Sequence, residues 1–138
     1  MSQRTIHITE FDQRRLSELL DELQRTGSAK REALQDLEGE LSRAEVVAPQ
    51  DIPPDVITMN SQARLYDLDA EEELIFTLVF PEDADLAENK VSVLAPIGMA
   101  MLGYRVGDVF EWQVPAGVSR LKVLEILYQP EAAGDYHL

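Results

Sequence analysis

Hydrophobic residues follow two different periods along the chain. In residues 9–46 leucines recur every three or four positions, the spacing of one apolar face on an α-helix. The two leucine series are Leu16, Leu19, Leu20 and Leu23, then Leu34, Leu37 and Leu41. Thr9 is a helix N-cap candidate, and residues 26–28 interrupt the pattern between the two series. The spacing therefore predicts a short antiparallel helical hairpin, packed as a coiled coil.

Prolines at 49, 53 and 54 end the helical pattern, since proline lacks an amide donor and disfavours helix in the preceding residue. After them, alternating or short apolar segments predict strands at 57–65, 74–80, 91–93, 109–114 and 121–128. Pro96 begins a short predicted helix that ends at Gly103. We expect a helical hairpin at residues 1–48 and, at residues 49–138, an antiparallel sheet domain with one short helix. The predicted fold class is α+β.

Charge is distributed unequally between these two parts. The chain has 12 Lys and Arg residues against 26 Asp and Glu residues, a net charge of −14. Residues 1–45 contribute −3, whereas residues 46–138 contribute −11. Phosphate backbones repel such a surface, so we expect no direct sequence-specific binding to nucleic acid. No apolar run approaches the roughly 18 residues of a membrane span and no secretory signal is visible, so we expect a cytoplasmic protein without a membrane partner.

The sequence offers few groups for catalysis. Cysteine is absent, and the two histidines, His7 and His137, lie near opposite ends of the chain. Thiol nucleophiles and thiolate metal sites are thereby excluded, and histidine-based triads are nearly excluded. The glycines of residues 98–103 have phosphate-loop spacing, but Tyr104 and Arg105 stand where Lys and Ser or Thr are required. We expect no enzyme activity, no catalytic residue, no cofactor and no metal.

The second domain resembles the Gre-type transcription elongation factors of bacteria. The matching segments are VSVLAPIG at 91–98, AMLG at 100–103, Gly107-Asp108 and the proline–glycine turn at 115–117. Residues 55–61, 95–98 and 128–136 look in particular like the Rnk branch of that superfamily, the regulators of nucleoside diphosphate kinase. The resemblance implies an FKBP-like second domain, RNA polymerase as partner, and control of kinase levels without phosphotransfer.

Two sites follow from this resemblance. The Gre docking loop precedes the short helix, which places candidate polymerase-docking residues at Leu94, Ala95 and Pro96. The second site is the hairpin tip, formed by Arg25, Thr26, Gly27, Ser28 and Lys30. Gre factors hold a catalytic magnesium ion with acidic residues at this tip, and residues 25–31 contain no carboxylate. We therefore expect a regulator that competes with Gre factors and does not stimulate transcript cleavage.

Three alternatives remain open. Trp112 and Phe110, with neighbouring aromatic residues, fit an FKBP-like prolyl isomerase or a peptide-binding module, although aromatic residues at a period of two are more often core. Asp21 and Glu22, one turn before the tip, would supply the carboxylates of an active cleavage factor. The basic residues of the tip also suit the negative C-terminus of the first helix without any partner.

Overall fold

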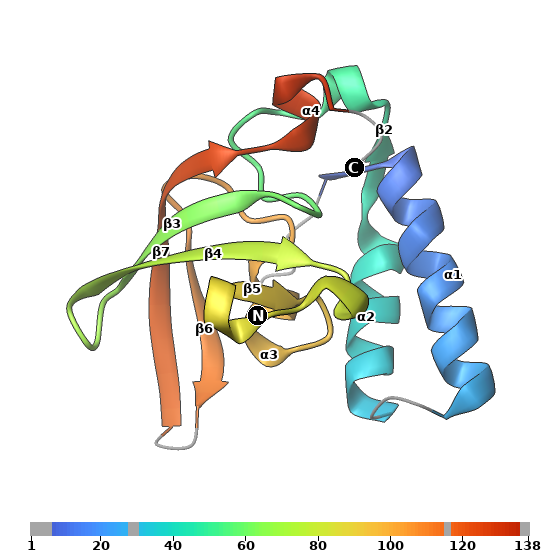
Figure 1. Cartoon of the computed structure of the whole chain (residues 1–138), viewed down its shortest axis with the longest axis horizontal. Helices are drawn as coiled ribbons and strands as arrows, with labels where there is room; N and C mark the ends of the chain where they lie inside the picture. The colour runs from blue at the N-terminus through green and yellow to red at the C-terminus, as the bar shows by residue number, and fades with distance from the viewer. Residues whose placement is uncertain (1–6, 28–30, 115–116, 136–138) are drawn as a thin grey trace.

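The computed structural model describes residues 7–27, 31–114 and 117–135, in which an N-terminal helical unit lies beside a curled β-sheet (Figure 1). The elements of the helical unit are β1 (His7–Thr9), α1 (Glu10–Thr26), α2 (Arg31–Arg43) and β2 (Glu45–Val47). The chain passes along α1 and returns beside it along α2 (Figure 1). β1 and β2 pair in parallel, and His7 Nε2 lies 2.9 Å from Glu45 Oε2 across this pair. The small sheet joins the two ends of the helical unit.

Both ends of α1 are capped, the first at Thr9 as the sequence predicts. Thr9 has an extended backbone, and its Oγ1 accepts a hydrogen bond of 3.0 Å from the amide of Asp12. Gly27 adopts a left-handed conformation, with φ of 67°, and its amide donates to Leu23 O. The leucine periodicity is also confirmed, because the two helices bury leucines on their facing sides. The buried leucines are Leu16 and Leu20 of α1 with Leu34 and Leu37 of α2.

The sheet domain contains five strands in the order β5-β4-β3-β7-β6. The strands are β3 (Gln62–Asp67), β4 (Glu72–Val79), β5 (Lys90–Ser92), β6 (Val109–Val114) and β7 (Gly117–Tyr128). Three pairings are antiparallel, but β5 runs parallel to β4, so the prediction of a wholly antiparallel sheet is wrong at this edge. The 3-10 helices η2 (Pro81–Asp83) and η3 (Leu86–Glu88) lie in the connection, which allows β5 to start in the same direction as β4.

The predicted strand at 57–65 forms only from Gln62 onward. Residues 58–61 make a turn, in which the Thr58 amide donates to Ser61 Oγ and the Ser61 amide donates to Thr58 O, each at 3.0 Å. Asn60 has a φ of 66°, which is incompatible with an extended strand. Ile57 and Met59 are fully buried by this turn, so their apolar alternation reflects burial without strand pairing.

Two further predictions need correction. The segment at 74–80 is apolar on both faces, a pattern that predicts a central strand. It forms most of β4, which is internal to the sheet, but Ile75 is 38% exposed, so one face of this strand meets solvent. The predicted single short helix is α3 (Pro96–Met101), followed by Gly103 with a φ of 85°. A second short helix, α4 (Pro130–Ala133), and the 3-10 helix η1 (Pro49–Asp51) accompany it. Of the predicted turn at 115–117, Pro115 and Ala116 lie outside the described residues.

One hydrophobic cluster joins the helical unit to the sheet domain. It contains Ile8, Leu16 and Leu37 from the helical unit together with Leu65 and Leu121 from the sheet. Within the described ranges, no helix is both long and apolar enough to cross a bilayer.

Candidate docking site

Ser92, at the end of β5, shapes the turn that carries the predicted docking residues. Its Oγ accepts a hydrogen bond from the Leu94 amide, and its carbonyl oxygen accepts one from the Ala95 amide, each at 3.0 Å. Leu94 and Ala95 are half-buried, whereas Pro96 is exposed at the first position of α3. Proline suits this position because its missing amide would have no partner within the helix. The turn is therefore held in one shape and presents Pro96 to solvent.

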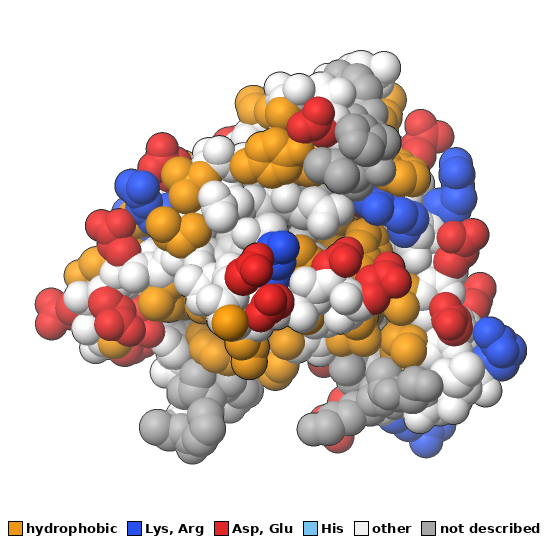
Figure 2. Space-filling view, in the orientation of Figure 1, with side chains coloured by type: hydrophobic (Ala, Val, Ile, Leu, Met, Phe, Trp, Pro, Cys, Tyr) orange, Lys and Arg blue, Asp and Glu red, His pale blue; other side chains and the backbone are white. Residues whose placement is uncertain are grey.

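Gly98 sets how closely α3 approaches this turn. A Cβ atom at residue 98 would lie 1.9 Å from Ser92 O and 2.8 Å from Ser92 C, far inside normal contact. Only glycine permits this approach of helix to backbone. Met99 and Ala100, on the same helix, are half-buried. Apolar side chains gather at the lower centre of Figure 2, where Figure 1 shows α3. The turn and α3 together form a preorganised, partly apolar surface.

The second predicted site, the hairpin tip, is exposed as far as it is described. Arg25, Thr26 and Gly27 are all exposed, and Thr26 Oγ1 donates to Glu22 O at 3.0 Å. Ser28 and Lys30 lie outside the described residues. At 1.5 Å per residue, the 17 residues of α1 span about 26 Å, so the tip projects only a short distance.

Metal-binding carboxylates do not cluster in the described ranges. Asp21 and Glu22 are exposed on α1, one turn before the tip. Among residues 7–27, 31–114 and 117–135, no group of three or more His, Asp or Glu side chains is placed to hold a metal ion.

The aromatic residues considered for a peptide pocket are used mainly in packing. Phe110 is 2% exposed and Phe80 is 8% exposed, so both belong to the core. Tyr104 stacks on Phe110 with ring centroids 5.0 Å apart. Trp112 is half-buried against the same cluster. The groove of the sheet domain that is described below is lined by other residues.

Comparison with known proteins identifies the family. Residues 52–128 match the model for the C-terminal part of the transcription elongation factors GreA and GreB, and residues 4–47 match the model for the Rnk N-terminus. The chain is 43% identical to the regulator of nucleoside diphosphate kinase of Escherichia coli K12, over the full length of both proteins. The chain belongs to the Rnk family of the GreA/GreB superfamily.

Other relatives place this Rnk family member beside the elongation factors. A solved structure titled prokaryotic transcription elongation factor GreA/GreB, from Nitrosomonas europaea, is 42% identical and superposes with a TM-score of 0.76. That match covers 91% of this chain and all of the other. The elongation factor GreA of Trichlorobacter lovleyi is 34% identical over 70% of this chain and 61% of its own length. The α+β fold with N-terminal helices and a curled sheet is therefore that of the GreA/GreB structures.

In this Rnk family member a buried polar cluster links the helical unit to the sheet domain, and the sequence did not reveal it. The Asp12 side chain is 1% exposed, and its Oδ1 accepts a hydrogen bond of 2.6 Å from Arg15 Nη2. Burial raises the pKa of Asp12 to about 6, with Arg15 and the Met59 backbone lowering it and Glu131 raising it further. From α4, Glu131 Oε1 accepts a hydrogen bond from Thr58 Oγ1 at 2.7 Å. The helical unit, the turn at 58–61 and α4 thus meet in one place.

Arg15 completes the junction. Its guanidinium lies over the ring of Phe11 at 4.0 Å and over the ring of Phe80 at 4.6 Å, distances typical of cation–π contacts. Because Phe80 follows β4 directly, this contact reaches from α1 into the sheet domain. The orientation of the helical unit on the sheet domain is accordingly fixed by polar as well as apolar contacts.

Proposed function

We propose that this Rnk family member is a transcription regulator that binds RNA polymerase at the docking site used by Gre-type factors. It competes with those factors and does not stimulate transcript cleavage. The observation that carries the proposal is the pairing of a preorganised Leu94–Pro96 turn with a short hairpin whose tip has no carboxylate. The elongation factors among its relatives support polymerase as the partner.

Each part of the chain has its own role in this proposal. Residues 49–138 form the docking domain, with an FKBP-like arrangement of sheet and helix, and residues 1–48 form a short coiled-coil hairpin. The strongly acidic docking domain favours a basic surface on a protein over a phosphate backbone. Such a regulator acts in the cytoplasm and needs no cofactor.

The lack of cleavage activity rests on the chemistry of the tip. Magnesium-assisted hydrolysis of RNA requires carboxylates placed around the ion, and residues 25–31 supply none. Asp21 and Glu22 are exposed, but they lie a turn back along a helix of about 26 Å. The chain thus occupies the docking site without supplying the catalytic group.

The name of the Escherichia coli relative points to nucleoside diphosphate kinase as the regulated product. Tyr104 and Arg105 replace the lysine and hydroxyl residues of a phosphate-binding loop, which argues against phosphotransfer by this chain. Its effect on the kinase is therefore an effect on kinase levels, exerted through transcription.

A cleavage assay on purified components tests the proposal. Polymerase is stalled in a backtracked complex with labelled RNA, a Gre-type factor is added at a half-saturating concentration, and the chain is titrated in. We expect the rate of Gre-stimulated cleavage to fall at least fivefold at saturation. With the chain alone, full-length RNA should be shortened no faster than in the backtracked complex without any factor.

Two proline variants provide a matched pair. Pro96 and Pro81 each begin a short helix of the sheet domain, and substitution by Glu changes the net charge equally. We expect Pro96→Glu to require about tenfold more protein for the same inhibition and Pro81→Glu to behave as wild type. Unchanged Gre-stimulated cleavage at saturating protein contradicts competition, and shortened RNA with the chain alone points to an active cleavage factor using Asp21 and Glu22.

A further inference from the structure

A groove of about 510 Å³ lies on the sheet domain and shares no residue with the turn at 94–96. Its apolar lining comes from Pro54, Val106, Leu124 and Ile126. Val106 is 41% exposed, and Pro54 is also exposed. Aliphatic side chains from three separate segments thus meet at one open site.

Irregular pairing of β7 with β3 explains why Leu124 lines this groove. Arg64 lies opposite Glu125, but the next residue, Leu65, lies opposite Val123, so Leu124 is an extra residue in the ladder. A bulge of this kind changes the direction of a side chain and ends the simple alternation of faces. Leu124 is consequently half-buried between the fully buried Val123 and the exposed Glu125.

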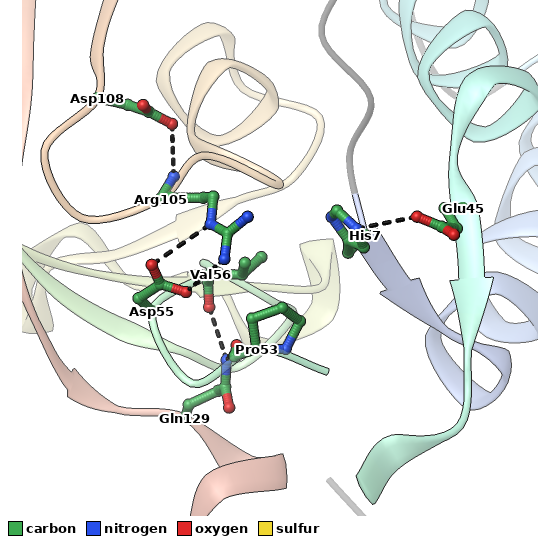
Figure 3. Close-up of polar contacts among 8 residues, drawn as sticks. All are labelled: His7, Glu45, Pro53, Asp55, Val56, Arg105, Asp108 and Gln129. Carbon is green, nitrogen blue, oxygen red and sulfur yellow. Dashed lines mark hydrogen bonds and ion pairs between the residues drawn. The ribbon is translucent and has the colours of Figure 1, made fainter. Parts of the chain in front are cut away.

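The wall of the groove opposite β7 is held in place by several hydrogen bonds (Figure 3). The buried Gln129 side chain donates through Nε2 to Pro53 O at 2.9 Å and to Val56 O at 2.8 Å. The Arg105 guanidinium binds the carboxylate of Asp55, and the Val106 amide donates to Asp55 O at 2.9 Å. The groove therefore exists before any ligand arrives, which lowers the entropy lost on binding.

The charged rim of the groove is acidic on balance. Its charged residues are Asp55, Arg64, Glu73 and Glu125. The single arginine already contacts two carboxylates, at 3.6 Å for Glu73 and 3.2 Å for Glu125. Asp55 is in turn paired with Arg105, so three carboxylates lie against two guanidiniums and leave one net negative charge around an aliphatic floor. A segment that fills it must be aliphatic at its centre and positively charged on either side.

We infer that this groove docks a short protein segment in which leucine or a similar aliphatic residue is flanked by Lys or Arg. The aliphatic side chain rests on Leu124, Ile126 and Val106, and the flanking cations face Glu73, Glu125 and Asp55. Burial of the aliphatic side chain supplies most of the affinity, and the charges supply orientation. This surface is additional to the proposed polymerase-docking turn and does not depend on it.

Binding of three synthetic hexapeptides to the full-length ¹⁵N-labelled chain tests the inference. The probe is Lys-Leu-Lys-Lys-Leu-Lys with blocked ends; one control replaces both Leu with Ser and the other replaces every Lys with Glu. We expect the first peptide to bind about tenfold or more tightly than the Ser control. The largest amide shifts should fall at residues 105–107 and 124–126, and the Glu control should not bind.

Matched variants separate the groove from the general acidity of the chain. Leu124→Gln should weaken binding of the first peptide about tenfold. Val118→Gln, at an exposed position of β7 outside the groove, should leave that binding unchanged. Glu125→Gln should weaken binding of the same peptide two- to threefold, whereas Glu111→Gln on β6 should leave it unchanged. Equal binding of the Leu and Ser peptides overturns the inference, as do shifts spread over the whole acidic surface. Concentration-dependent self-association through the groove, without peptide, would assign it to a second copy and also overturn it.

Discussion

Asp12 provides a quantitative test of the junction between the helical unit and the sheet domain. The substitution Asp12→Asn removes the negative charge but keeps an Oδ1 acceptor for Arg15, whose Nη2 lies 2.6 Å from the Asp12 oxygen. Burial raises the pKa of Asp12 from 3.8 to about 6 in the folded protein. The folded state therefore binds a proton that the unfolded state has already released between pH 3.8 and 6, and stability falls as pH rises through that window.

The pKa values set the size of the expected effect. Since one pKa unit corresponds to 1.36 kcal/mol, raising the pKa from 3.8 to about 6 amounts to about 3 kcal/mol of lost stability above pH 6. Asp12→Asn should be more stable than wild type at pH 8, by up to about 3 kcal/mol. The difference should shrink between pH 6 and 4 and disappear below about pH 4, where both side chains are neutral.

Urea denaturation of both proteins between pH 3.5 and 8 measures this difference directly. Asp21→Asn is the control, because Asp21 is exposed on the same helix and its substitution should change stability by less than about 0.5 kcal/mol. A difference between wild type and Asp12→Asn that does not vary with pH would refute the reasoning. A wild type that is more stable at pH 8 would show that the ion pair with Arg15 outweighs the burial of charge.

Three further substitutions test other parts of the structure by urea denaturation. Gly98→Ala should destabilise the protein by about 3 kcal/mol or more, since its Cβ would lie 1.9 Å from Ser92 O. Gly39→Ala is the control: its Cβ would meet only the flexible end of an arginine, and it should stabilise α2 by about 0.5–1 kcal/mol. Equal effects of the two substitutions would contradict the close approach at Gly98. Thr9→Ala should lower the free energy of unfolding by about 1 kcal/mol because it removes the α1 cap. An unchanged free energy of unfolding would show that the cap contributes nothing. Gln129→Met should lower the free energy of unfolding by about 1–3 kcal/mol, because the buried Val56 carbonyl loses its hydrogen bond while the Pro53 carbonyl keeps the one from the Val56 amide. A neutral result would mean that water replaces the amide.

The helical unit was largely predictable because its signals are local. Thr9 caps α1, the leucines of both helices recur at helical spacing, and Gly27 ends α1 in a left-handed conformation. Each of these signals acts within one or two turns of helix, a distance that sequence patterns describe well. The parallel pairing of β1 with β2 escaped prediction, because strands of three residues carry too little alternation to be detected.

The sheet domain differs from its prediction where residues are buried without regular pairing in a strand. Ile57 and Met59 alternate with polar residues as a strand would, yet they are buried by a turn stabilised through Thr58 and Ser61. The extra residue at Leu124 likewise breaks a pattern that alternation alone assumes to be regular. These features depend on contacts between distant segments, which the period of a single segment does not encode.

The candidate site was likewise predictable in its local features but not in its contacts between distant segments. The motif located the turn at 94–96 and the short helix after it, since proline and glycine mark both ends of α3. The contact between Gly98 and Ser92, and the meeting of Asp12 with Glu131, require the folded arrangement of separate elements. Resemblance to the Gre factors supplied the position of the candidate site, and the structure supplies the reason why the shape of this turn is fixed.

Displacement of a fluorescent Gre-type factor from core RNA polymerase tests the central claim most directly. Fluorescence anisotropy follows the labelled factor as the unlabelled chain is added, with Pro96→Glu and Pro81→Glu as the matched variants. We expect wild type and Pro81→Glu to displace the factor completely, and Pro96→Glu to require about tenfold more protein. Anisotropy that stays high at saturating chain, whether the chain fails to bind or binds beside the Gre factor, would contradict the account.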